Sequence, residues 1–259
     1  MNLFFGKCVG ACLWGILFWI PWNVHALYLG NPDGAELVTE GLWSCSSPWI
    51  GGEAGYQIDN VFNRRVKIEN APYLHISPYK MRFNQGVVTL IGFNRAEIYA
   101  PIGAIEMDFT TQNRSTGALT QFQTNDHFTW GIGGRLILSE WWGIVFGVLG
   151  SFQHARFCFS PTEWMGRAAS PSAGLRYYEW QLGGGMSTTM DWFTPYIAAK
   201  YSYFSANVTT MSSKLKLRSV EHFGLVLGFS LAAKRAFSLT VEARLIDEES
   251  LTGAWSFRF

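Results

Sequence analysis

Residues 236–247 read AFSLTVEARLID, and apolar and polar side chains alternate along this stretch. Phe237, Leu239 and Val241 fall on one face, and hydroxyl or charged side chains fall on the other. Because successive side chains of a β-strand point to opposite faces, the stretch predicts a strand with one apolar face. Residues 222–232 (HFGLVLGFSLA) repeat the alternation with glycines opposite the large apolar residues. A soluble β-sandwich needs bulk on its inner face, so this pattern favours a membrane barrel.

The composition points the same way. Aromatic residues make up 16% of the chain and charged residues 15%, against about 25% charged residues in typical globular proteins. The longest apolar run of the predicted mature part, residues 141–150 (WWGIVFGVLG), is about half of the ~20 residues that a spanning helix needs. The formal net charge of +1 argues against a nucleic-acid-binding protein, which would carry a basic stripe.

The N-terminus predicts a cleaved signal peptide. A short start with Lys7 precedes the apolar run CVGACLWGILFWIPW and a site of small side chains that ends at Ala26. An uncleaved anchor is the alternative, and the break at Pro21, with turn-rich sequence after it, argues against that alternative. The sequence therefore predicts a signal peptide at 1–26 and one outer-membrane β-barrel at 27–259.

Alternation and gap lengths predict the topology. The segments with alternating polarity are separated by gaps, and along the chain a short gap is followed in turn by a mostly longer one. Short periplasmic turns and long outer loops produce this order of gaps. An even strand number requires one strand more than the eleven segments found, and Ala35–Ser44 is the best candidate. We expect an all-β, antiparallel, up-and-down barrel of about 12 strands, within a range of 10–16. The eleven segments are 49–58, 61–69, 86–93, 96–109, 127–138, 142–154, 175–188, 192–205, 218–232, 237–247 and 251–259.

The last segment, LTGAWSFRF, predicts the closing strand of the barrel. Trp255, Phe257 and Phe259 should face lipid, and Arg258 should face the lumen. A C-terminal phenylalanine on an aromatic, alternating strand resembles the signal that the outer-membrane barrel assembly machinery recognises. We therefore expect this machinery and the membrane lipid to be partners of the chain.

Five blocks of sequence carry a family resemblance. They read ALYLGNP from residue 26, WIGGEAGYQIDNVFNRRV from 49, HFTWGIGGRLILSEWWGIVFGVLGSFQHAR from 127, YYEWQLGGGMSTTMDWFTPYIAAKYSYFSAN from 177 and SLTVEARLIDEESLTGAWSFRF from 238. In the same order, these blocks resemble the major outer membrane protein of chlamydiae, a porin family. The resemblance implies a trimeric outer-membrane porin that passes small solutes and ions by passive diffusion. The chain is shorter than the family's main member and lacks its richness in cysteine, so pore size, selectivity and cross-linking stay open.

Polar side chains of the strands are assigned to the lumen. Placing Arg or Lys in lipid at mid-membrane costs about 2–4 kcal/mol. Such residues either form a constriction that filters ions or pair in a lumenal salt-bridge network. A twelve-stranded barrel is narrow, so a non-conducting structural or surface-exposed, adhesin-like barrel is the alternative to a pore. The residues assigned to the lumen are Glu53, Gln57, Glu97, Glu106, Asp108, Arg135, Glu179, Gln181, Lys200, Glu242, Arg244 and Arg258.

Aromatic residues near the strand ends predict girdles at the two membrane interfaces, where amphipathic rings are favoured. Ordinary β propensity is the alternative explanation. The residues are Trp130, Trp141, Trp142, Tyr178, Trp180, Trp192, Tyr201, Tyr203 and Trp255.

The remaining reactive residues predict neither a metal site nor catalysis. Cys45 and Cys158 fall in predicted outer loops and can pair with each other, pair with another chain or stay free. The three histidines His127, His154 and His222 are isolated, so we expect no metal and no cofactor. Some small outer-membrane barrels modify lipids with Ser, His and Asn or Asp. HARFCFS and NDH offer these residue types, but nucleophile elbow, P-loop and zinc-helix signatures are missing, and we expect no enzyme.

Overall fold

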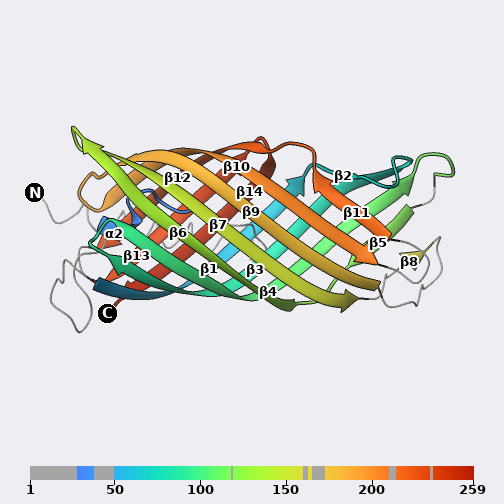
Figure 1. Ribbon diagram of the computed structural model, residues 1–259, viewed down its shortest axis with the longest axis horizontal. Coiled ribbons are helices and arrows are strands. Elements are labelled where there is room, and N and C mark those ends of the chain that lie inside the picture. The colour runs from blue at the N-terminus through green and yellow to red at the C-terminus, as the bar shows by residue number, and fades with distance from the viewer. Residues whose placement is uncertain are drawn as a thin grey trace, which may run out of the picture.

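The computed structural model describes residues 28–37, 50–117, 119–159, 163–164, 173–209, 214–233 and 236–259. Within them, fourteen strands form a single sheet that curls into an elongated barrel (Figure 1). No helix in this part of the chain is long and apolar enough to cross a membrane. The signal peptide predicted at 1–26 lies outside the described residues.

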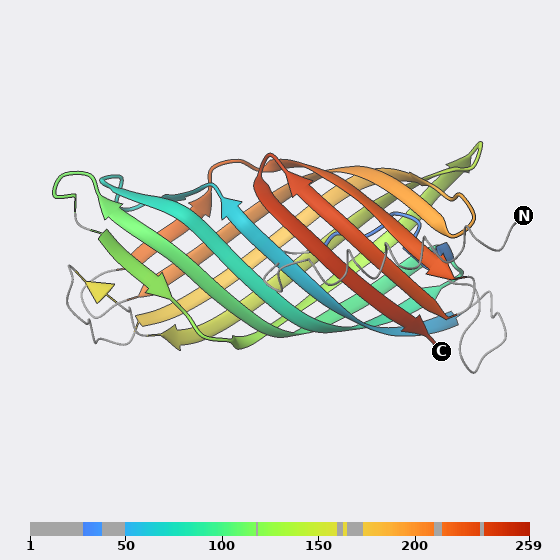
Figure 2. The same cartoon turned by 180° about the vertical axis from the view of Figure 1, so that it is seen from behind.

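Ten antiparallel strands close the barrel. The last strand, β14, pairs with the first, β1, and this pairing closes the barrel (Figure 2). β10 pairs directly with β12, so the strand that lies between them in the sequence is not part of the closed ring. The predicted class of fold is therefore confirmed, with ten strands instead of the expected twelve. These ten are β1 (Ile50–Arg64), β3 (Leu74–Gly92), β4 (Ala96–Asn113), β6 (His127–Trp141), β7 (Ile144–Phe159), β9 (Ala173–Thr188), β10 (Phe193–Thr209), β12 (Phe223–Ala233), β13 (Phe237–Leu245) and β14 (Glu248–Arg258).

Two errors account for the difference in strand number. The turn predicted at 59–60 does not exist, because β1 continues through both residues to Arg64. Asp59 and Asn60 are common in turns, but here the Asp59 carboxylate accepts a hydrogen bond from Arg244 inside the barrel, at 2.5 Å. The strand predicted at 35–44 is wrong in its described part, where Gly34–Leu37 form the short helix α2.

The two ends of the barrel differ. One end has tight turns with left-handed residues, such as Asn94 (φ 51°) and Trp142 (φ 54°). The long connections at the other end contain extra strands, which are β2 (Val66–Ile68), β5 (Leu119–Gln123), β8 (Glu163–Trp164) and β11 (Lys214–Ser219) (Figure 1). Short periplasmic turns and long outer loops are the rule in bacterial outer-membrane barrels, so we call these the periplasmic and the outer end.

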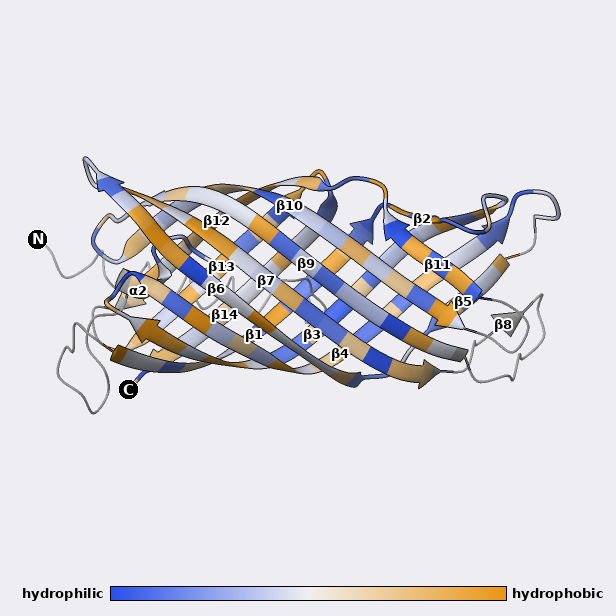
Figure 3. Ribbon diagram, in the orientation of Figure 1, coloured by the Kyte–Doolittle hydropathy of each residue, from blue (hydrophilic) through white to orange (hydrophobic). Residues whose placement is uncertain are grey.

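The outer face of the barrel is the side of the sheet that points away from the lumen. An apolar belt surrounds the part of this face that is nearer to the periplasmic end. Ile98, Ile102 and Ile132 are more than half exposed there, and Figure 3 shows orange and blue residues alternating along the strands. About eleven residues of β7, from Ile144 to His154, span the belt, which matches the ~9–11 residues of a tilted membrane strand.

Rows of aromatic residues border the belt, as the girdle prediction expects. Trp141 and Trp142 lie at the periplasmic turns, with ring centroids 5.2 Å apart. Toward the outer end, Trp180 stacks against Tyr201 at 5.4 Å and against Tyr203 at 6.0 Å. On the closing strand, the side chains of Trp255, Phe257 and Phe259 are on the outer face and 37–45% exposed.

Candidate functional site: the filled lumen

Ten of the twelve residues assigned to the lumen do point inward. Because they alternate with lipid-facing residues along their strands, the pleat alone fixes their direction. All are buried except Arg135, whose side chain is 11% exposed. They are Glu53, Gln57, Glu97, Arg135, Glu179, Gln181, Lys200, Glu242, Arg244 and Arg258.

Glu106 and Asp108 were assigned to the lumen but lie on the outer face of β4. Their neighbours Ile105 and Met107 point inward and are fully buried. Glu106 sits opposite Arg82 of β3, with their charged atoms 3.6 Å apart. The assignment assumed that polar side chains face inward along the whole strand. Beyond the membrane the outer face meets water, so the polarity of the two faces reverses there.

The periplasmic third of the lumen holds residues 28–37. The backbone amides of Leu29 and Gly30 donate to the Glu242 carboxylate at 3.1 and 2.8 Å. The Asn31 side-chain amide donates to the Ser230 hydroxyl at 3.1 Å. Because Leu29 and Asn31 are completely buried, this segment is a plug held by the barrel wall.

An arginine and its neighbours complete this periplasmic layer. Arg135 forms an ion pair with Glu97 at 2.9 Å and lies over the rings of Tyr28 and Tyr99, at 5.7 and 4.9 Å from their centroids. The space left beside these residues and Glu53 is about 50 Å³, room for a few water molecules.

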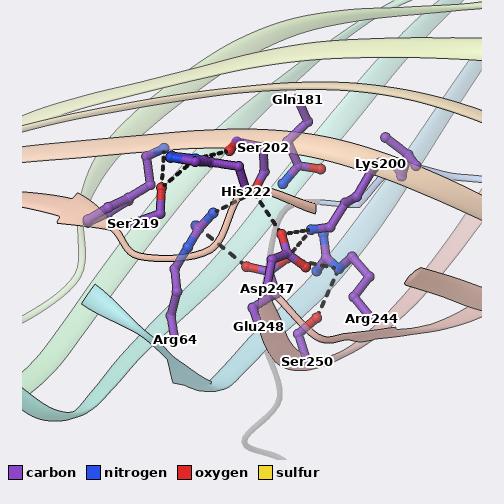
Figure 4. A network of polar contacts seen from close by, with 12 residues as sticks. Arg64, Gln181, Lys200, Ser202, Ser219, His222, Arg244, Asp247, Glu248 and Ser250 are labelled. Carbon is purple, nitrogen blue, oxygen red and sulfur yellow. Dashed lines mark hydrogen bonds and ion pairs between the residues drawn. The ribbon is translucent and has the colours of Figure 1, made fainter. Parts of the chain in front are cut away.

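A layer of buried ion pairs crosses the middle of the lumen (Figure 4). Both terminal nitrogens of Arg64 donate to Glu179, at 2.7 and 2.8 Å. The Lys200 ammonium contacts Glu248 at 2.5 Å and Asp247 at 3.0 Å. All of these side chains are at most 1% exposed, so the ion pairs tie strands together instead of lining an open passage.

Carboxylates outnumber cations in this layer. The cations are Arg64, Lys200 and Arg244, and the carboxylates are Asp59, Glu179, Glu242, Asp247 and Glu248. Hydroxyl and phenol groups support the carboxylates, since Tyr177 donates to Glu179 at 2.7 Å and Tyr196 donates to Glu242 at 2.8 Å. Sharing each cation among several acceptors satisfies most of the buried charges.

The sequence prediction missed four residues of the ion-pair layer. Asp59, Asp247 and Glu248 were placed in or beside turns, and Arg64 lies beyond a register shift between Val61 and Asn63. Glu53 and Gln57 point inward, and every second residue of a strand points to the same side. Continuing this pattern two residues beyond Gln57 would have identified Asp59. No comparable signal exists for Arg64, because the bulge changes the face on which it falls.

The outer third of the lumen is apolar. Tyr79 packs against Phe109 and Phe204, with ring centroids 5.3 Å apart in both pairs. Phe109 stacks on Phe122 of β5 at 4.8 Å. These residues belong to one buried cluster that also includes Met81, Phe83, Ile105, Met107, Phe157, Leu175 and Leu217. This part of the barrel resembles the core of a soluble barrel.

Within the part of the chain that the structure describes, cysteine and histidine side chains form no second site. Cys158 is an exposed cysteine at the outer end of β7 and forms no disulfide with a described residue. Cys45 lies outside the described residues, so whether the two cysteines pair with each other, pair with another chain or stay free remains a prediction. His127 stacks on Phe157 at 4.3 Å. Among the described residues, no group of three or more His, Cys, Asp or Glu side chains is placed to hold a metal ion.

Comparison with known proteins finds similarity both in sequence and in fold. No family model matches the chain. The major outer membrane porin, serovar C, of Chlamydia trachomatis is 23% identical, over 92% of this chain and 96% of the porin. The chain is an outer-membrane β-barrel. This localisation rests on the apolar belt of the barrel together with the similarity to an outer-membrane porin.

Solved structures of outer-membrane proteins have similar folds. An outer membrane channel from Pseudomonas putida F1 matches with a TM-score of 0.40 and 10% identity, over 93% of this chain and 99% of the channel. The outer membrane protease OmpT from Escherichia coli matches with a TM-score of 0.39 and 11% identity, over 81% of this chain and 91% of the protease.

Proposed function

We propose that this protein is a non-conducting outer-membrane barrel with a structural, surface-exposed role. The filled lumen carries the proposal. A plug, an ion-pair layer and an apolar cluster follow one another from the periplasmic end to the outer end. Beyond the belt, β2, β5 and β11 extend the barrel outward and provide a folded surface outside the membrane.

Each layer obstructs the passage of ions by itself. Separating a buried pair such as Arg64 and Glu179 costs about 3–5 kcal/mol. An ion that entered the cluster around Tyr79 would lose its water and meet mainly apolar side chains. Withdrawal of the plug alone would therefore leave two barriers in place.

Conductance in planar lipid bilayers tests the proposal. We expect no discrete conductance steps from the folded chain, and none from a variant that lacks residues 28–37. Folding of both proteins is checked by the shift in electrophoretic mobility on heating. Discrete steps from the folded, unaltered chain would overturn the proposal.

Passive diffusion of small solutes is the second candidate function. The similarity to a porin along most of both chains favours it. It requires all three layers to rearrange, so conductance of the full chain is the result that would favour it. Trimer formation and recognition by the barrel assembly machinery stay predictions, as does the absence of enzymatic activity.

A further inference from the structure

A row of three basic side chains and one asparagine crosses the outer face just beyond the aromatic row. Arg156 of β7 is directly opposite Arg176 of β9, and Asn207 of β10 is opposite both Arg176 and Lys216 of β11. Side chains directly opposite each other in an antiparallel pair have Cβ atoms ~4.5–5.5 Å apart. The row is therefore continuous over four strands.

The two arginines face each other without a counter-charge. Both are exposed, and no carboxylate of the described residues forms an ion pair with either. Like charges directly opposite in a sheet destabilise it. On β3 and β4, by contrast, Arg82 faces Glu106. The arrangement of Arg156 and Arg176 is thus suited to an anion from outside the chain.

A hollow beside the row offers space for that anion. Its volume is about 540 Å³, and its lining includes both arginines together with Lys214, Lys216 and Asn207. None of the described residues that line it is acidic. Lys216 is shared with Glu69, at 2.7 Å, whereas Lys214 is exposed and has no such partner among the described residues.

The height of the row in the membrane identifies the kind of anion. Arg156 follows His154 by two residues, and Arg176 precedes Tyr178 by two, so both lie ~5 Å beyond the aromatic row on tilted strands. Aromatic rows lie at the level of the lipid head groups. Guanidinium groups bind phosphate oxygens with paired hydrogen bonds.

We propose that Arg156 and Arg176, with Lys214 beside them, bind the phosphate of a lipid head group in the outer leaflet. The phosphate oxygens take the place of the missing carboxylate between the two arginines. The site needs the barrel to stand in the outer membrane but is independent of whether the lumen conducts.

Binding of diphosphorylated lipid A to the detergent-folded barrel tests the site. The unaltered chain is compared with two variants, R156Q/R176Q and R82Q/E106Q. The second is a control, because it removes a charged pair that also lies on the outside of the barrel but on β3 and β4, away from the proposed site. We expect the first variant to bind about 25-fold more weakly, since each basic side chain near an anionic surface contributes about fivefold. The control should bind lipid A as tightly as the unaltered chain does. Dephosphorylated lipid should bind weakly to all three proteins, with the affinity that R156Q/R176Q has for lipid A.

Two further results distinguish the source of the phosphate and the state of the fold. Inorganic phosphate at the same concentration should not displace the lipid; if it does, the site serves a free anion and the proposal fails. R156E should lose lipid binding and raise the urea concentration needed to unfold the barrel, because the new carboxylate pairs with Arg176. Equal lipid binding by the unaltered chain and R156Q/R176Q would overturn the proposal, as would equal weakening in the control.

Discussion

Arg64 and Glu179 form a two-pronged ion pair in the lumen, joining β1 to β9 although 115 residues separate them in the chain. The guanidinium also lies over the ring of Phe204, 4.9 Å from its centroid. The pair stands between the apolar outer cluster and the polar lower lumen. Through this contact, two residues that are far apart in the sequence hold two strands of the barrel wall at a set distance across the lumen.

Breaking this pair from one side should destabilise the barrel strongly. We expect R64A to lower the free energy of unfolding by about 3–5 kcal/mol, because Glu179 would stay buried without its partner. Replacing both residues by apolar ones of similar volume, as in R64M/E179L, should cost much less. Urea unfolding in lipid vesicles, followed by tryptophan fluorescence, measures the difference.

The exposed pair of Arg82 and Glu106 supplies the control for that measurement. Its charged atoms are 3.6 Å apart on the outer face, and exposed pairs contribute about 0–1 kcal/mol. Equal losses in R64A and R82A would contradict the assignment of Arg64 to a buried ion-pair layer.

The plug should protect its residues from water-soluble reagents. We expect a cysteine at Asn31, in a chain whose own cysteines are replaced by serine, to react with a charged maleimide only after unfolding in urea. The side chain of Asn31 is completely buried against Ser230. A cysteine at Ser115, in an exposed turn at the outer end, should react in the folded barrel. Rapid labelling at both positions would show that residues 28–37 do not occupy the lumen.

Much of the fold follows from alternation alone. The pattern around Phe237 and Leu239 reflects one face in lipid and one in the lumen, and this physical division exists for every strand inside the membrane. It fails where the surroundings change. Glu106 is nine residues from the inward-facing Glu97 on the same strand, so strand parity places it on the opposite face. Its assignment to the lumen followed its polarity instead, which no longer indicates the lumenal face where water replaces lipid beyond the belt.

The candidate site was predictable in its parts and not as a whole. Inward positions such as Glu242 and Arg244 follow from strand parity. Their roles depend on partners brought by other strands, as when Asp59 meets Arg244 from 185 residues away. That juxtaposition is a property of barrel closure and register, which no stretch of sequence carries by itself. The filling of the lumen was accordingly open at the sequence level, as an alternative to a pore.

Glycine at position 228 leaves room for a tyrosine ring. Tyr196 lies directly opposite Gly228 in the pair of β10 and β12, and a Cβ atom at Gly228 would overlap its ring. We expect G228A to destabilise the barrel by about 1–3 kcal/mol through overpacking, since the ring is also held by its hydrogen bond to Glu242. The matched change is G253A, where a Cβ meets nothing within 4 Å. It should be neutral or stabilise by about 0.5–1 kcal/mol. Urea unfolding compares the two, and a loss in G253A as large as in G228A would refute the explanation by packing.

Acid should loosen the contact between β2 and β11 at the outer end. A hydrogen bond from Lys216, together with the charge of Arg218, holds the pKa of Glu69 below its usual value of 4.5. A carboxyl group whose pKa is lowered by folding stabilises the folded state above its unfolded pKa, and this stabilisation is lost as the pH falls through the folded pKa. We therefore expect the carboxyl carbon shift of Glu69 in detergent micelles to titrate below pH 4.5. The protection of its amide against hydrogen exchange, relative to an unfolded amide at the same pH, should fall over the same range, because this amide donates to the Lys216 carbonyl at 2.8 Å. K216Q should move the midpoint back toward 4.5, and E69Q should remove the pH dependence of this protection. An unchanged midpoint in K216Q would show that the ion pair does not hold this edge of the barrel.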